Sequence, residues 1–461
     1  MPSKRRPLTV LVLAAGKGTR LRSKTIKLLH GVAGRPMVCW VLDSAAALKP
    51  TRTLAVVGYQ ADAVKAALAD SGCSFVLQQE QRGTGHAVLQ ASRAVGSKPG
   101  TLLILNGDVP ALRVATLRRL VNLHDRKGAA LTVLTADLDD ATGYGRVLRD
   151  GRGNVERIVE QSDASPEERR VREINTGVYV ADPGKLMRIL RKLKPDNDQG
   201  EYYITDAVHH LLAAGQPVAA LKHNDFSEVL GVNTRQELAE ASHRLFRRRA
   251  EELQSSGVTL LDAARTWIDP RAKVGRDTVI YPGVIVEGPC KIGTDCVIRP
   301  GCRIVDSNIG SGTEIKDYSI LSESRVARNA SVGPFAHLRP GSVLEDGSKV
   351  GNFVELKKTR LGRGSKANHL AYLGDSTIAE DCNIGAGTIT CNYDGTHKHR
   401  TTLERGVFIG SDTQLVAPVK VGKGAYVAAG STVTKDVPAG ALALSRVKQK
   451  NIKGWVKKKK S

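Results

Sequence analysis

The chain has 461 residues, 41% of them hydrophobic; this composition excludes a wholly disordered protein, and the length predicts about two to four domains. Its net charge of +23 would suit nucleic acid, but aromatic residues make up only 4% of the chain and no nucleic-acid-binding motif is recognisable, so phosphorylated small molecules are the expected anions. No apolar run approaches the roughly 20 residues that span a bilayer, so we expect no membrane insertion.

The first clear pattern is the apolar run at residues 9–13, which predicts a β-strand. It leads into the loop Gly16-Lys17-Gly18-Thr19-Arg20, whose glycines would let backbone N–H groups approach phosphate oxygens. The loop lacks the spacing of a Walker A or dinucleotide motif, so by itself it fits either a phosphate site or a tight turn. The basic start of the chain lacks a secretory cleavage pattern, and we expect a cytoplasmic protein.

Strand and helix patterns then alternate, which predicts an α/β domain with a Rossmann-like, mostly parallel sheet. Strands are expected at residues 54–57, 74–77, 102–105 and 131–134, and helices at residues 61–68, 85–94 and 114–124. Ligands of such sheets bind at the carboxyl ends of the strands. Polar clusters follow three of these ends, at residues 16–20, 78–86 and 106–108, so we expect them to converge on one nucleotide.

Asp108 directly follows a predicted strand, where a carboxylate can hold Mg²⁺ against phosphate oxygens. A turn or helix cap before Pro110 explains it equally well. Gly145, Glu160 and Asn175 lie in segments whose glycines and polar side chains suit sugar hydroxyls, although each segment also fits a simple turn.

A capping-box pattern at residues 234–237 predicts a helix that runs to about Ser255 and ends at Gly257. We place a nucleotide-binding domain at residues 1–233, a linker helix at residues 234–256, and a second domain at residues 257–461 that ends in a basic tail.

The second domain carries an aliphatic residue at every sixth position over long stretches, beginning with Ile268, Val274 and Ile280. This period predicts a parallel β-helix whose stacked coils bury a common aliphatic column. The count is interrupted between residues 361 and 378 and between residues 389 and 409, where we expect inserted functional loops.

Four cysteines each fall four residues after a repeat aliphatic: Cys290, Cys296, Cys302 and Cys382. A six-residue spacing places successive cysteines on different faces of a three-faced coil, so they cannot converge on a metal. We expect them to be small core residues without disulfides.

Ordered motifs run along nearly the whole chain. In the first half they are Leu13-Ala14-Ala15-Gly16-Lys17-Gly18-Thr19-Arg20, Gly83-Thr84-Gly85-His86-Ala87, Gly107-Asp108-Val109-Pro110, Asn175-Thr176-Gly177, Glu201-Tyr202-Tyr203-Ile204-Thr205-Asp206 and Gly231-Val232-Asn233. In the second half they are Leu338-Arg339-Pro340-Gly341, Gly351-Asn352-Phe353-Val354-Glu355, Asn383-Ile384-Gly385-Ala386-Gly387-Thr388 and Asn392-Tyr393-Asp394-Gly395. By these motifs the chain resembles the bifunctional bacterial family of N-acetylglucosamine-1-phosphate uridyltransferase and glucosamine-1-phosphate acetyltransferase. It departs from the family at Thr25-Ile26, where Leu-Pro is usual, and at Asn106, where Tyr is frequent.

The resemblance implies that the first domain condenses UTP with N-acetylglucosamine 1-phosphate and releases pyrophosphate. It implies Asp108 and Asn233 as Mg²⁺ ligands, and Arg20 and Lys27 as catalytic cations. The residues that it implies for UTP and the UDP-sugar product are Leu13, Ala14, Ala15, Gly16, Lys27, Gln78, Gly83, Thr84, Asn106, Gly107, Asp108, Gly145, Glu160, Asn175 and Asn233.

For the second domain the resemblance implies acetyl transfer from acetyl-CoA to glucosamine 1-phosphate on a left-handed, homotrimeric β-helix. His369 would be the base that removes the ammonium proton, although a lone histidine is more often structural. The residues implied for the sugar phosphate are Arg339, Lys357, Tyr372 and Asn383. Those implied for acetyl-CoA are Ala386, Asn392, Tyr393, Ser411, Ala429 and Arg446.

Two other hypotheses remain open on the sequence alone. In one, the first domain is a sugar-1-phosphate nucleotidyltransferase, and the β-helix only oligomerises or regulates it. In the other, the chain is a non-enzymatic scaffold that binds nucleotide sugars and releases no pyrophosphate.

Overall fold

The computed structural model describes residues 6–96 and 99–458. The chain forms two compact units, Met1–Leu245 and Phe246–Ser461, and the boundary lies inside helix α8 (Arg235–Ser255). The predicted capping box forms at the start of α8: Glu237 N donates to Thr234 Oγ1 at 3.2 Å, and Thr234 N donates to Glu237 Oε2 at 2.8 Å. In the described part of the chain, no helix is long and apolar enough to cross a membrane.

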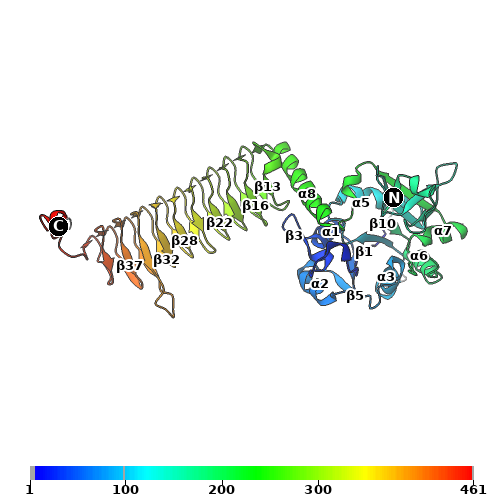
Figure 1. The fold of residues 1–461 in the computed structure, drawn as a ribbon, viewed down its shortest axis with the longest axis horizontal. Coiled ribbons are helices and arrows are strands. Elements are labelled where there is room, and N and C mark those ends of the chain that lie inside the picture. Colours follow the sequence, from blue (N-terminus) through cyan, green and yellow to red (C-terminus); the bar gives the residue numbers. More distant parts are fainter. Residues whose placement is uncertain (1–5, 97–98, 459–461) are drawn as a thin grey trace. The chain divides into compact units, whose positions relative to one another are not determined.

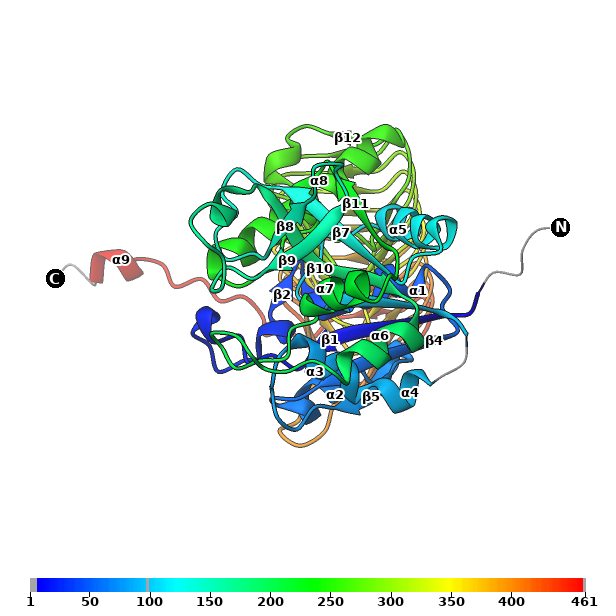
Figure 2. The same cartoon turned by 90° about the vertical axis from the view of Figure 1, so that its right-hand side faces the viewer.

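The first unit is built on one mixed sheet (Figure 1). Its main path is β11-β7-β10-β6-β1-β4-β5, and β8 and β9 extend it beside β10. The strands are β1 (Leu8–Ala14), β4 (Arg52–Val57), β5 (Ser74–Leu77), β6 (Thr101–Asn106), β7 (Leu131–Asp137), β8 (Arg146–Arg149), β9 (Val155–Val159), β10 (Glu173–Ala181) and β11 (Val218–His223). Figure 2 shows β1 beside β4, which are parallel, and β10 beside β7, which are antiparallel.

The predicted strands and helices of this unit are confirmed, with ends that differ by a few residues, except that the single helix predicted at residues 85–94 forms two helices, α3 and α4. Its helices are α1 (Met37–Ala46), α2 (Ala61–Ala67), α3 (Thr84–Gln90), α4 (Ser92–Val95), α5 (Val114–Lys127), α6 (Pro183–Leu190) and α7 (Asp206–Ala213). Two 3₁₀ turns, η1 (Thr19–Leu21) and η2 (Lys27–Leu29), follow β1, and a short hairpin joins β2 (Gly31–Val32) to β3 (Arg35–Pro36). The strands β6 and β7 are buried almost throughout, and β1 and β4 over more than half of their residues, as expected where helices cover the faces of a sheet.

The second unit is a parallel β-helix with three sheets, one for each face of a prism (Figure 1). Face 1 contains β12 (Thr259–Leu260), β15 (Val279–Ile280), β18 (Val297–Ile298), β21 (Glu314–Ile315), β24 (Ser331–Val332), β27 (Lys349–Asn352), β30 (Lys366–His369), β33 (Asn383–Ile384), β36 (Phe408–Ile409), β39 (Tyr426–Val427) and β41 (Leu442–Ala443).

Face 2 contains β13 (Trp267–Ile268), β16 (Ile285–Glu287), β19 (Arg303–Val305), β22 (Ile320–Ser322), β25 (His337–Leu338), β28 (Glu355–Lys357), β31 (Tyr372–Gly374), β34 (Ile389–Cys391), β37 (Gln414–Val416) and β40 (Thr432–Val433). Face 3 contains β14 (Lys273–Val274), β17 (Lys291–Ile292), β20 (Asn308–Ile309), β23 (Arg325–Val326), β26 (Val343–Leu344), β29 (Arg360–Leu361), β32 (Ser376–Ile378), β35 (Thr401–Leu403) and β38 (Val419–Val421). A short helix, α9 (Trp455–Lys458), lies near the end of the chain.

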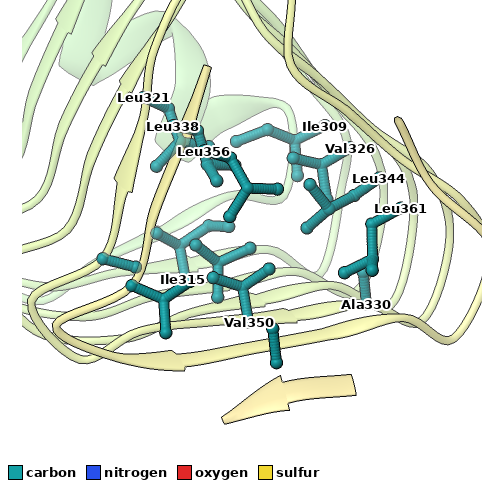
Figure 3. Packing of buried hydrophobic residues seen from close by; sticks show 14 of the residues in the cluster. Ile309, Ile315, Leu321, Val326, Ala330, Leu338, Leu344, Val350, Leu356 and Leu361 are labelled. Carbon is teal, nitrogen blue, oxygen red and sulfur yellow. The ribbon is translucent and has the colours of Figure 1, made fainter. Parts of the chain in front are cut away.

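One buried aliphatic column fills the prism, as the six-residue period predicts (Figure 3). In Figure 3, Ile309, Val326, Leu344 and Leu361 of face 3 point into the same interior as Leu321 and Leu338 of face 2. The predicted burial of Cys290, Cys296, Cys302 and Cys382 is confirmed, and all four are free thiols.

The predicted interruption between residues 361 and 378 is wrong. Ala367 and Leu373, both fully buried, continue the column there, and Ala367 pairs with Val350 and with Ile384 in register. The aliphatic count misses this coil because an alanine takes the place of a larger aliphatic residue. His369 therefore lies on strand β30 rather than in an inserted loop.

The second interruption is an insertion, as predicted. Residues 392–400 leave the prism between β34 and β35 and form the loop that projects from the orange coils in Figure 1. The coil from Ile384 to its partner Ile409 is seven residues longer than the next coil, from Ile409 to Val427. The pairing resumes on all three faces after the loop, so the insertion changes the surface and leaves the column intact.

Candidate active sites

Four of the predicted catalytic and metal-binding residues of the first unit meet in one cluster. Lys27 Nζ lies 2.5 Å from Asp108 Oδ2 and 2.6 Å from Asn233 Oδ1, and Arg20 Nη2 donates to the same Asn233 oxygen at 2.9 Å. Asp108 follows β6 and Asn233 precedes α8, so the cluster joins distant parts of the chain. Val232 N donates to Asp108 O at 2.9 Å, which holds these two segments together.

Close packing explains how Lys27 reaches this cluster. Gly18 has a φ of +64°, and a Cβ there would lie 2.3 Å from the Lys27 Cβ, so the glycine-rich loop needs a glycine against the lysine side chain. Ile26, one of the departures from the family, is buried and begins the η2 turn that carries Lys27. The turn positions the lysine without the usual proline.

The predicted nucleotide residues lie at or after the carboxyl ends of β1, β5 and β6, where ligands of α/β sheets bind. Gly107 N donates to Leu13 O at 3.0 Å, and Tyr59 N donates to Ala15 O at 3.4 Å, so the carboxyl end of β1 is hydrogen-bonded to the segments that follow β6 and β4. The side chain of Asn106, the second departure, lies over Gly177, where a Cβ would be 2.1 Å from Asn106 Nδ2.

Gln78, Gly83 and Thr84 lie together at the start of α3. The Gln78 side chain is buried, and its Nε2 donates to Gly83 O at 3.3 Å. The Thr84 Oγ1 accepts from Ile204 N at 3.2 Å, and a Cβ on Gly83 would lie 2.7 Å from Tyr202 O. The segment before α7 therefore fixes this loop and explains its glycine.

The predicted sugar residues Gly145, Glu160 and Asn175 also meet. Asn175 N donates to Gly145 O at 2.9 Å, and a Cβ on Gly145 would lie 3.2 Å from Glu160 Oε2. Thr205 Oγ1 donates to Glu160 Oε1 at 3.0 Å. Burial raises the pKa of Glu160 above its usual range, while the bond from Thr205 lowers it in part. Glu160 also borders a cavity of about 650 Å³ with Asp163, Tyr203 and Asp206.

In the second unit, the predicted sugar-phosphate residues Arg339, Lys357 and Tyr372 occupy successive coils of face 2. Glu355 pairs with Tyr372 in the ladder, and Arg339 Nη1 donates to Glu355 Oε1 at 2.8 Å. The pKa of Lys357 is lowered, first by its contact with the Lys398 side chain and then by burial and by the charges of Lys398 and Arg339. Several cations therefore gather here without full neutralisation, which suits a phosphate dianion.

His369 and Asn383 lie on face 1, one strand apart on β30 and β33. His369 Nδ1 lies 2.8 Å from Asn352 Oδ1, and the two residues are paired across β27 and β30. A Cβ on Gly351 would lie 1.8 Å from Asn368 O, so a glycine allows the close approach that brings Asn352 to His369. Sequence reasoning gave Asn352 no role, because the pairing register was not visible.

The predicted acetyl-CoA residues line one corner of successive coils. Asp412 N donates to Ala386 O at 2.7 Å, Gly430 N donates to Ser411 O at 2.8 Å, and Arg446 Nη1 donates to Ala429 O at 2.6 Å. Ala386, Ser411 and Ala429 thus stack one above another.

Asn392 and Tyr393 begin the inserted loop between β34 and β35. Asn392 Nδ2 donates to Asp375 Oδ2 at 2.5 Å, and a Cβ on Gly374 would lie 2.7 Å from Asn392 Nδ2 and 2.5 Å from the hydroxyl of Tyr372. The loop is held by Asp394, which accepts from His399 Nε2 at 2.6 Å. Backbone donors and His399 keep the pKa of Asp394 well below its usual range.

Known proteins resemble this chain in both halves. Residues 9–269 match the family model described as nucleotidyl transferase, residues 263–359 match a GMPPB C-terminal domain, and residues 400–435 match a bacterial transferase hexapeptide of six repeats. A bifunctional protein GlmU from Pelobacter propionicus is 50% identical over 97% of this chain and 98% of its own. The protein of that name from Trichlorobacter lovleyi is 49% identical over 98% of both chains, and that from a Geobacillus strain is 46% identical over 97% of both.

Proposed function

The chain belongs to the family of bifunctional GlmU proteins, and from this premise we propose how its two units divide the work. The protein is an enzyme with two transferase activities on small-molecule substrates. One transfers acetyl from acetyl-CoA to glucosamine 1-phosphate. The other transfers uridylyl from UTP to N-acetylglucosamine 1-phosphate and releases pyrophosphate. The alternative, a β-helix that only oligomerises or regulates, is not favoured by relatives that match along the whole chain.

The observation that carries the proposal is that the candidate residues gather in two separate clusters, one in each unit. Lys27, Asp108 and Asn233 meet in the first, and His369 lies beside Asn352 in the second. Each cluster has the chemistry that one of the two reactions requires.

In uridylyl transfer, we propose that an oxygen of the sugar phosphate attacks the α-phosphorus of UTP while the bond to pyrophosphate breaks. Arg20 and Lys27 neutralise the charge that develops on the phosphates. Gln78, Gly83 and Thr84 hold the uridine, and Gly145, Glu160 and Asn175 hold the sugar, so that the attacking oxygen and the phosphorus are aligned.

The uridylyl transferases of this family work with a divalent metal, and we propose Mg²⁺ for this chain. Two oxygens, Asp108 Oδ2 and Asn233 Oδ1, already lie within 2.6 Å of one cationic atom, Lys27 Nζ, so they fit a common cation. Among the described residues no cluster of three His, Cys, Asp or Glu side chains forms a metal site, so phosphate oxygens and water would complete the shell. The metal would supply positive charge at the phosphates.

In acetyl transfer, we propose His369 as the base. Asn352 Oδ1 accepts the Nδ1 proton, which leaves the lone pair on Nε2 to remove a proton from the substrate ammonium. The amine then attacks the thioester carbonyl, the carbon–sulfur bond breaks, and CoA leaves as a thiolate that takes up a proton. Arg339, Lys357, Tyr372 and Asn383 hold the acceptor, and the corner built by Ala386, Ser411 and Ala429, with Asn392, Tyr393 and Arg446, holds acetyl-CoA.

We further propose that the chain forms a homotrimer in the cytoplasm. Tyr318, Phe335 and Phe353 stack at ring distances of 5.4 and 5.3 Å along one corner of the prism and remain about half exposed, an apolar surface that another copy can cover. The cysteines of the described chain are free, which suits a reducing compartment. Sedimentation of the pure protein tests the trimer.

Assays of the two half-reactions test the function. With pure protein, CoA thiol should appear from acetyl-CoA and glucosamine 1-phosphate, and pyrophosphate from UTP and N-acetylglucosamine 1-phosphate. His369→Ala should abolish the first and spare the second, and Asp108→Ala should do the reverse. Absence of thiol release with pyrophosphate release intact would support the one-activity alternative, and binding without either product would support the scaffold.

A further inference from the structure

His86 has no role in either proposed reaction, yet it is hydrogen-bonded to a nucleotide residue. Its Nδ1 lies 3.0 Å from Gln78 Nε2, and its Nε2 lies 2.9 Å from the side-chain amide of Gln90, one turn further along α3. His86 therefore links Gln78, which precedes α3, to Gln90 at the end of the helix.

Donor and acceptor rules fix the orientation of the Gln78 amide. Gly83 O can only accept, so the atom 3.3 Å from it must be the amide nitrogen. The same nitrogen then donates its second hydrogen to His86 Nδ1, which must carry a lone pair. The backbone of Gln78 is also tied down, since its N donates to Val57 O at 2.8 Å and its O accepts from Gln81 Nε2 at 3.3 Å.

The proton of a neutral His86 must then lie on Nε2. Two donors cannot face each other, so the Gln90 amide turns to present its oxygen to this N–H, a rotation that leaves the atom positions almost unchanged. Gln90 is exposed and His86 is half-buried, so the chain of bonds runs from the surface to the buried Gln78 side chain, which is 3% exposed.

The Gln78 Oε1 is the one atom of this side-chain amide whose partner is still to be named. Within the described residues it accepts no hydrogen bond, and it is not enclosed. A carbonyl oxygen accepts from the N3–H of uracil, whereas N3 of cytosine carries a lone pair and would face that oxygen with no hydrogen between them. A buried polar group left unpaired by the wrong substrate is a strong source of discrimination.

We propose that His86 is a positioning residue that sets nucleobase specificity: by holding the Gln78 amide nitrogen, it commits the Gln78 oxygen to uracil and disfavours cytosine. This inference rests on the proposed contact between Gln78 and the uridine. Gln90 accepts from Nε2–H of His86 and so favours the tautomer whose Nδ1 can accept from the Gln78 amide.

The exposed position 90 gives the sharpest test, because it lies outside the proposed nucleotide site and a substitution there can act on Gln78 only through His86. Gln90→Glu keeps an acceptor for the Nε2–H and should preserve the ratio of kcat/KM for UTP to that for CTP. Gln90→Lys donates to Nε2 and moves the ring proton to Nδ1, which turns the Gln78 amide. It should lower the ratio about tenfold, chiefly through a higher KM for UTP.

Two variants of His86 provide the second arm. His86→Leu should lower the ratio about tenfold, and His86→Asn, whose Oδ1 replaces the Nδ1 acceptor, should restore it to within about threefold of the parent. A ratio that is unchanged in Gln90→Lys, or that falls equally in Gln90→Glu, overturns the inference.

Gln78→Leu separates this inference from the proposed function. A higher KM for UTP in Gln78→Leu with an unchanged ratio in the His86 and Gln90 variants would overturn only the role of His86. An unchanged KM for UTP in Gln78→Leu would instead overturn the placement of uracil at Gln78, and the inference with it. Acetyl transfer, measured alongside, reports whether the second unit is intact in each variant.

Discussion

Glu160 shows how a single side chain can serve a site at a cost to stability. It is largely removed from water between Gly145 and Thr205, and burial raises its pKa. A carboxyl whose folded-state pKa is raised makes the native state less stable as the pH rises from below the unfolded-state pKa through the folded-state pKa. In the proposed function this cost is offset, because a carboxylate would bind the sugar hydroxyls strongly.

Glu160→Gln should therefore raise the thermal midpoint of the first unit at pH 8 and change it little at pH 4, where the carboxyl is mostly protonated in both states of the parent. The same variant should raise the KM for N-acetylglucosamine 1-phosphate. Calorimetry at the two pH values measures the first effect, with Glu156→Gln, at an exposed position on β9, as the control. A midpoint that falls at pH 8 would contradict the assignment of Glu160 as a destabilising buried charge.

In the proposed acetyl transfer, Asn352 orients His369, the proposed base. The Asn352 amide oxygen lies 2.8 Å from His369 Nδ1 and can accept a hydrogen bond there without adding a negative charge beside the imidazole. Asn352→Leu should lower kcat of acetyl transfer about tenfold with little change in KM.

Asn352→Asp places a carboxylate at the same distance and should raise the pKa of His369, which moves the acidic limb of the kcat profile to higher pH. The pH profile of thiol release measures this shift, and uridylyl transfer should be unchanged in both variants. Identical profiles for Asn352→Asp and the parent would remove Asn352 from the mechanism.

At the scale of the element, each coil of the prism contributes short strands to the three sheets, and the inward-facing residue of each strand packs in the buried core. Strand β22 offers a matched pair, since Leu321 is fully buried and its neighbour Ile320 is 39% exposed. Leu321→Ala should destabilise the second unit by about 2–5 kcal/mol, because it leaves a cavity in a continuous column, whereas Ile320→Ala should cost well under that amount. Urea unfolding of the two variants measures the difference, and equal losses would contradict the column.

The inserted loop can be removed without disturbing the ladder that surrounds it. Deleting residues 393–399 shortens that coil to the length of the next one. The ladder pairs that span it, Ile384 with Ile409 and Thr390 with Leu415, can form across a coil of that length. We expect the circular dichroism of the β-helix to be retained and acetyl transfer to fall at least about 100-fold, because Tyr393 and the Lys398 contact to Lys357 are lost. Full acetyl transfer by the deletion variant would place acetyl-CoA elsewhere.

At the scale of the whole molecule, N-acetylglucosamine 1-phosphate is the product of one proposed reaction and the substrate of the other, and the two candidate sites lie in different units. A mixture of His369→Ala and Asp108→Ala proteins should therefore convert glucosamine 1-phosphate to the UDP-sugar, although neither variant does so alone. The expected rate is that of two separate enzymes joined by diffusion, with a lag that shortens as protein concentration rises. A mixture that makes acetylated intermediate but no UDP-sugar would show that the intermediate does not leave the protein.

The sequence by itself determined those features that depend on local pattern. The six-residue period determined the prism and the burial of four of its cysteines, Cys290, Cys296, Cys302 and Cys382, because a repeat places every equivalent residue alike. Alternating strands and helices determined the sheet and the edge at which Gly16, Gln78 and Asp108 follow its strands. The ordered motifs determined the family.

Only the tertiary structure decided which residues meet across long separations. Lys27 and Asn233 are 206 positions apart, and no local pattern states that the Lys27 ammonium contacts both Asn233 and Asp108. The register of β27 and β30 decided that Asn352 faces His369, and the buried Ala367 decided that His369 lies on a strand. The reason is physical: helix and strand periods are set by neighbours in the chain, whereas hydrogen-bond partners are set by packing, which brings distant segments together only once the core has formed.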